Sequence, residues 1–86
     1  MPYVIDTVAT ITAVHQALSL AAQMADGPAR DRLIARANEA LSVCSYYMRY
    51  PRVQAKKEHY ESVQRLLALI AEHIVLTTLP TIKGTV

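Results

Sequence analysis

The stretch RLLALIAEHIVLTTL, residues 65–79, decides the fold of this chain. Its Leu, Ile and Ala residues recur at the spacing of an α-helix, with Arg65 and Glu72 marking a polar side. The apolar residues spread over far more than the ~100° stripe that an ordinary surface helix buries. The stretch therefore predicts a helix that packs against more than one neighbour.

Glycine and proline mark where helices break along the rest of the chain. Glycine suits the end of a helix, and proline suits the first position of the next helix or stops one that has formed. The breaks fall at Gly27-Pro28, at Pro51 and at Pro80. They predict three helices, over residues 4–25, 28–49 and 55–79.

The bulk composition agrees with a single small helical domain. The chain has 86 residues, of which 52% are hydrophobic and 19% are charged, with a net charge of +2. This apolar excess excludes a disordered chain, which would be polar and highly charged. We predict an all-α fold, either a three-helix bundle or an extended helical hairpin plus a third helix. Residues 1–80 form the domain, and residues 81–86 form a short flexible tail.

The first predicted helix has two sides suited to packing. Apolar residues at heptad spacing predict its main buried face, and alanines four residues apart form a row on the opposite side, where no long charged side chain occurs. A solvated face would carry Lys, Glu or Arg. The heptad face is Val4, Val8, Ile11, His15, Leu18 and Ala22, and the alanine row is Ala9, Ala13, Ala17, Ala21 and Ala25. We therefore expect this helix to be contacted on more than one side.

The other two helices divide between buried and outer faces in the same way. The inner face of the second helix is predicted to hold Leu33, Ala37, Ala40, Leu41, Cys44 and Met48, and its outer face Arg32, Arg36, Glu39, Val43, Tyr46 and Tyr50. On the third helix, Val75 and Leu79 lie on the nominally wet side, beyond the reach of two neighbours. We predict a homodimer through the first and third helices, with Val75 and Leu79 as self-association residues.

The residue types that carry catalysis or bind metals show no matching pattern. No glycine-rich phosphate loop is present, and Cys44 on an apolar face reads as a small buried hydrophobe. No histidine has another ligand three or four residues away, although His15 and His73 would meet if the first and third helices pack together. We predict no catalytic residue, no cofactor and no metal site, and we leave a pH-sensitive histidine contact open.

Cysteine usage and hydropathy bear on the compartment. A lone cysteine makes no disulfide within the chain, which favours the reducing cytoplasm. Residues 7–25 lack formal charge, but Thr, His, Gln and Ser interrupt them, so we predict no membrane span.

The segment YYMRYPRVQAKKEHY, residues 46–60, is the strongest candidate for a binding surface. Tyrosine beside arginine is typical of protein-binding hot spots and of platforms on which nucleic-acid bases stack. The alternative is a solvated connection in which Tyr47 and Tyr60 close the end of the core. We predict partner-protein contacts at Arg36, Tyr46, Arg49, Tyr50 and Arg52, with nucleic-acid contacts at Arg49, Arg52, Lys56 and Lys57 as the second hypothesis.

The segment EHYESVQRLLALIAEHIVL, residues 58–76, resembles the long helix of small bacterial type III secretion co-chaperones. That resemblance implies a protein that clamps aggregation-prone helical subunits. Together with the surface residues above, it leads us to expect a non-catalytic helical interaction module, acting as an adaptor, a small chaperone or an inhibitor-type regulator.

Overall fold

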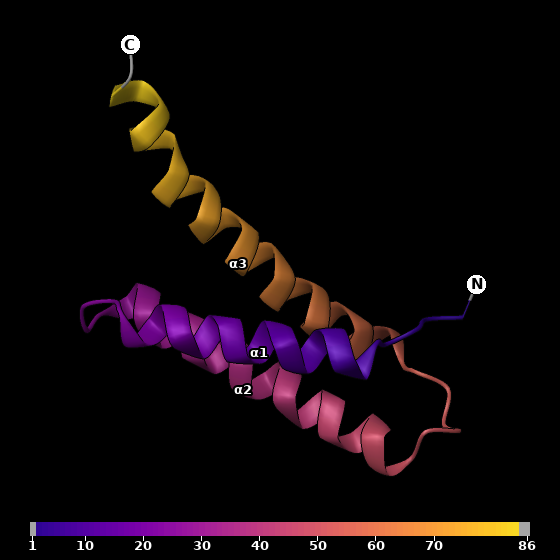
Figure 1. Ribbon diagram of the computed structural model, residues 1–86. Helices are drawn as coiled ribbons and strands as arrows, with labels where there is room; N and C mark the ends of the chain where they lie inside the picture. The colour runs from indigo at the N-terminus through magenta and orange to yellow at the C-terminus, as the bar shows by residue number, and fades with distance from the viewer. Residues whose placement is uncertain (1, 85–86) are drawn as a thin grey trace.

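The computed structural model describes the backbone of residues 2–84 and the side-chain environments of residues 2–74. It contains three helices, α1 (Thr7–Ala22), α2 (Pro28–Arg49) and α3 (Lys57–Gly84). The helices α1 and α2 form an antiparallel hairpin, and the first half of α3 packs against it before α3 diverges from the hairpin (Figure 1). The predicted all-α three-helix fold is confirmed.

The start of α1 is set by a side-chain cap and not by the first apolar residue. The backbone N–H of Ala9 donates to Oδ1 of Asp6 at 3.0 Å, which satisfies one of the free donors of the first helical turn. The residues before Asp6 are extended, and Tyr3 forms an isolated antiparallel bridge with Ala55. The helix therefore begins at Thr7, three residues after the predicted start, and it ends at Ala22.

Pro28 marks the start of a helix as predicted, whereas Pro80 does not end one. Pro28 occupies the first turn of α2 as predicted, where its missing N–H has no helical partner to lose. The predicted end of the third helix at Leu79 is wrong, because α3 continues through Pro80 to Gly84. Proline removes one hydrogen bond inside a helix, but its fixed φ is compatible with helical backbone. The flexible tail of residues 81–86 stays a prediction.

The core is built from the small residues of α1 and α2, with α3 seated on top. The hairpin buries alanines from both helices, and Leu66 and Ile70 of α3 cover them. Short side chains let two helix backbones come close, so the alanines pack where larger residues would hold the helices apart. The buried set is Ala13, Val14, Ala17, Ala21, Leu33, Ala37, Ala40, Leu66 and Ile70.

The predicted buried face of α1 is therefore wrong. Val8 is 76% exposed, Val4 and Leu18 are also exposed, and His15 faces solvent. The alanine row, which we expected another molecule to cover, packs inside its own chain at Ala13, Ala17 and Ala21, while its end members are exposed. Both faces have helical spacing, and the close approach of α2 selects the one with the smaller side chains.

The buried face of α2 differs from the predicted face by a rotation about the helix axis, and this difference is smaller than the one for α1. Val43, expected outside, is 6% exposed and packs with Tyr47 and with Val63 of α3. Leu41 and Met48, expected inside, are exposed. The reason is that α3 lies along the Val43 side of α2, so the buried arc faces both neighbours and not α1 alone.

Candidate interaction surfaces

Tyr47 fixes the end of the bundle where the connection to α3 begins. Its hydroxyl oxygen accepts a hydrogen bond from the backbone N–H of Lys56 at 3.0 Å and lies 2.7 Å from Nδ1 of His59. Because the Lys56 N–H can only donate, the Tyr47 proton is available to His59. Tyr47 is 6% exposed, so it closes the end of the core, as the structural alternative for this segment predicts.

The outer side of the last turns of α2 carries a shallow open hollow of about 400 Å³. Its lining includes Tyr46, Arg49 and Tyr50, which are predicted partner-binding residues. The ring centroids of Tyr46 and Tyr50 are 5.2 Å apart, and the Tyr46 ring also meets Tyr47 edge-on at 4.9 Å. Contacts on two sides hold the Tyr46 ring in place. We call these three residues and this depression the Tyr/Arg hollow.

The sequence prediction missed the remaining residues of the hollow. Leu41, Ser42 and Ser45 complete its lining. Leu41 and Ser45 precede Arg49 at intervals of four residues, and Ser42 precedes Tyr46 and Tyr50 at the same interval, so the six residues form two adjacent rows on one helix face. Helical spacing therefore contained the signal, but small hydroxyl residues do not stand out by composition.

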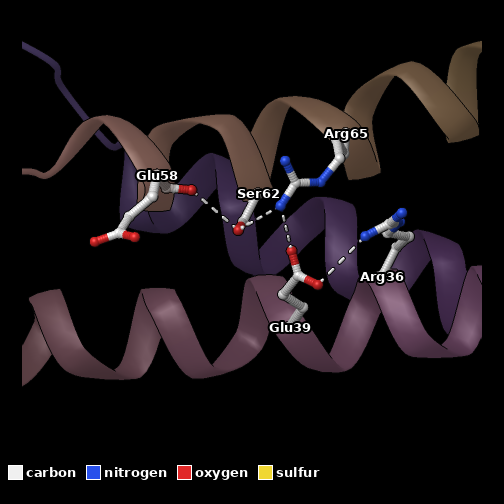
Figure 2. A network of polar contacts seen from close by, with 5 residues as sticks. All are labelled: Arg36, Glu39, Glu58, Ser62 and Arg65. Carbon is white, nitrogen blue, oxygen red and sulfur yellow. Dashed lines mark hydrogen bonds and ion pairs between the residues drawn. The ribbon is translucent and has the colours of Figure 1, made fainter.

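Arg36, another predicted partner-binding residue, belongs to a different part of the molecule. Its Nη1 lies 3.4 Å from Oε2 of Glu39, and the other oxygen of Glu39 pairs with Nη2 of Arg65 at 2.8 Å (Figure 2). The same Arg65 nitrogen donates to Oγ of Ser62 at 3.0 Å. The hydrogen bond from Arg65, strengthened by the nearby positive charges, lowers the pKa of Glu39. Arg36 thus joins the α2–α3 contact and not the Tyr/Arg hollow.

Arg52 also lies outside the hollow, in a groove formed by the N-terminal segment and the α2–α3 connection. This open groove of about 460 Å³ is lined by Tyr3, Val4, Gln54 and their neighbours. Nε2 of Gln54 donates to the backbone oxygen of Tyr3 at 3.1 Å and ties the two segments together. The residues predicted to bind one partner are therefore divided between separate surfaces.

The residues of the nucleic-acid hypothesis are all accessible but do not line one common groove. Arg49 lines the Tyr/Arg hollow, Arg52 lines the N-terminal groove, and Lys56 and Lys57 are exposed at the start of α3. None of the four forms a salt bridge within residues 2–74.

Cys44 is a structural residue. It is fully buried, its Sγ donates to the backbone oxygen of Thr7 at 3.3 Å, and burial raises the pKa of its thiol. Because the thiolate is the reactive form, this cysteine is a poor nucleophile at neutral pH. The prediction of a small buried hydrophobe is confirmed.

The histidines lie in separate environments. His15 is exposed on α1, whereas His73 lines a small pocket with Arg32 and Leu69 between α2 and α3. Among the described residues, no group of three His, Cys, Asp or Glu side chains is arranged to hold a metal ion. The side chains of Val75 and Leu79 lie outside the described residues, so their assignment to self-association stays a prediction.

No helix in the described part of the chain combines the length and the apolar character needed to cross a lipid bilayer. Comparison with protein-family models, with curated proteins and with solved structures gives no match to this chain. The resemblance of residues 58–76 to secretion co-chaperones therefore stays a hypothesis.

Proposed function

We propose that this protein is a non-catalytic, cytoplasmic interaction module that binds a partner protein through the Tyr/Arg hollow. The observation that carries the proposal is the convergence of Tyr46, Arg49 and Tyr50 on one open depression of α2. Tyrosine and arginine dominate binding energy in protein interfaces, and a hollow gives a partner side chain a place to insert. Adaptors, small chaperones and inhibitor-type regulators all act by such binding.

The chemistry of the hollow indicates what the partner presents. The two tyrosine rings offer apolar surface whose order is already established by ring contacts, so little side-chain entropy is lost on binding. Arg49 forms no salt bridge within the described residues, which leaves its guanidinium available for a partner carboxylate. We infer a partner segment that combines an apolar anchor with an acidic side chain.

Affinity capture with matched variants tests the proposal. The tagged protein and its Arg49→Ala/Tyr50→Ala variant are used to capture proteins from an extract of the source cells. Arg32→Ala serves as the control, since Arg32 is an exposed arginine of α2 outside the hollow. Loss of two hot-spot side chains is expected to weaken binding of the captured partner by about 30-fold or more. Unchanged binding by the double variant would remove the hollow from the proposal.

A second candidate function is nucleic-acid binding. It is favoured by the exposure of Arg49, Arg52, Lys56 and Lys57 without salt-bridge partners, close in sequence to the exposed rings of Tyr46 and Tyr50. Bases stack on aromatic rings, and the phosphate backbone follows basic side chains.

Salt dependence separates the two candidates. Fluorescence anisotropy with a labelled single-stranded oligonucleotide is measured over a range of salt concentrations. Nucleic-acid binding predicts a logarithmic slope of about −0.7 per neutralised phosphate, and a clear loss of affinity in Arg52→Ala/Lys56→Ala. The protein-binding proposal predicts retention of a protein partner by that same variant, because neither residue lines the hollow.

A further inference from the structure

The face of the α1–α2 hairpin that points away from α3 is lined by apolar side chains. Two hydrogen bonds set the antiparallel register of the hairpin, from Cys44 Sγ to the Thr7 oxygen and from Arg30 Nε to the Ala21 oxygen at 3.0 Å. This register brings Ile11 of α1 to the level of Leu41 of α2, and Leu18 to the level of Ile34.

Helix geometry shows that these residues point away from α3. On α2, Glu39 bonds to α3, and Leu41 lies two residues further on, about 200° around the helix. On α1, Ala9 lines a pocket with Val63 of α3, and Ile11 is again two residues further on. We call the surface of Val8, Ile11, Leu18, Ile34, Leu41 and Met48 the open face.

The open face is only partly covered by its own chain. Val8 is 76% exposed, Met48 57%, Leu41 41% and Leu18 39%. An exposed apolar patch that extends along two adjacent helices is typical of an interaction site.

The charge pattern of the open face identifies what covers it. The sequence of α1 from Thr7 to Ala22 contains no Asp, Glu, Lys or Arg. Between Ile34 and Met48 the charged residues of α2 are Arg36 and Glu39, which pair with each other, and Glu39 also pairs with Arg65 of α3. Arg30, one turn before Ile34, lies at the end of the face and pairs with Asp26, and His15 is exposed on the α1 side. A two-fold axis through the middle of the face, around Ile11 and Leu41, therefore brings no like charges together.

The spacing of the apolar residues fits helix-on-helix packing. Ile11 and Leu18 are one heptad apart on α1, and Ile34, Leu41 and Met48 are one heptad apart on α2. Side chains repeated every seven residues keep facing a neighbouring helix along its length.

We propose that a second copy of this chain covers the open face. Two hairpins then stack across a two-fold axis into a four-helix arrangement, with α3 of each copy on the outside. This interface uses α1 and α2, in place of the first and third helices expected from the sequence. Leu41 lines both the open face and the Tyr/Arg hollow, so the two surfaces meet at this side chain, whereas Tyr46, Arg49 and Tyr50 are not part of the open face.

Sedimentation equilibrium tests the proposal. The wild-type chain is expected to show a mass of twice 9.5 kDa at up to about 100 µM, a concentration at which a dimer with a micromolar Kd is filled. The variants Val8→Glu and Leu18→Glu place carboxylates against their own copies, so each is expected to return the mass to 9.5 kDa. Val8 is exposed, and its variant is therefore expected to keep the helical circular dichroism of the wild type.

Leu67→Glu is the matched control, since Leu67 is 39% exposed on α3, as Leu18 is on α1. The control is expected to remain a dimer. A monomeric wild type overturns the proposal, as does a dimer that survives both Val8→Glu and Leu18→Glu. Dissociation by Leu67→Glu while the α1 variants stay dimeric also overturns it, because the interface would then lie on α3.

Discussion

Arg65 of α3 reaches across to α2, where its Nη2 lies 2.8 Å from Oε1 of Glu39 (Figure 2). The same nitrogen bonds to Ser62, whose hydroxyl donates to the backbone oxygen of Glu58 at 3.1 Å. The sequence spacing of Glu61 and Arg65 favours an ion pair within α3. The structure places Arg65 with Glu39 instead, and the pair joins two helices.

Acid is expected to weaken this contact between α2 and α3. The hydrogen bond from Arg65 lowers the pKa of Glu39 from its usual value of 4.5, so the folded state favours the charged form. The resulting stabilisation is complete at pH values above 4.5, the usual pKa of the carboxyl. It is lost as the pH falls through the lower pKa that Glu39 has in the folded state. Urea unfolding of the wild type and of Glu39→Gln at a series of pH values measures the effect. The difference in the free energy of unfolding between them is expected to shrink in acid. A difference that stays constant with pH contradicts the assignment.

Removal of one hydroxyl from Tyr47 is expected to destabilise the end of the bundle. Tyr47→Phe removes the hydrogen bonds to the backbone N–H of Lys56 and to Nδ1 of His59, both partly buried, and each such bond contributes about 0.5–1.5 kcal/mol to the free energy of unfolding. Tyr46→Phe is the control, because no hydrogen bond of the Tyr46 hydroxyl is present within the described residues and the side chain is 38% exposed. Its effect is expected to stay within about 0.5 kcal/mol. Equal effects of the two substitutions would contradict this role of Tyr47.

The alanine core of α1 has no room for a larger side chain. Ala17 is fully buried, so Ala17→Leu is expected to reduce the free energy of unfolding by about 1–3 kcal/mol through overpacking. Ala9→Leu adds the same atoms at an exposed position of the same row and is expected to change stability by less than about 0.5 kcal/mol. Thermal unfolding at a concentration where both variants share one oligomeric state measures the difference. If Ala9→Leu destabilised the protein more than Ala17→Leu, this would contradict the burial of the alanine row and favour the heptad face as the buried side of α1.

The cap of α1 contributes separately from the core. Asp6→Ala removes the acceptor of the Ala9 N–H and is expected to cost about 1 kcal/mol, whereas Asp6→Asn keeps an acceptor and is expected to retain most of the stability. Asp26→Ala is a matched control, because the Asp26 side chain is 96% exposed in its pair with Arg30 and such pairs contribute little. Urea unfolding distinguishes the three variants, and a loss in Asp6→Asn equal to that in Asp6→Ala would exclude capping as the cause.

The local part of the candidate site was predictable from the sequence. Tyr46, Arg49 and Tyr50 lie three and four residues apart, so a helix places them on one face whatever packs against its other side. Arg36 lies 3.4 Å from Glu39, an i,i+3 pair that helical spacing allows, but the pairing of Glu39 with Arg65 depends on how α3 packs against α2. Arg52 lies in a groove made with the N-terminal residues. No rule of spacing within one helix predicts these two longer-range contacts.

The amino-acid sequence by itself determined that the chain is helical and where α2 begins, because periodicity and the N-terminal preference of proline act within a few residues. Only the tertiary structure decided which face of α1 is buried. Its valine–leucine face and its alanine face both have helical spacing, and the hydrophobic effect alone favours the larger side chains. Close contact with α2 and α3 reverses that preference, because only small residues fit between closely packed backbones. The larger apolar residues therefore remain at the surface.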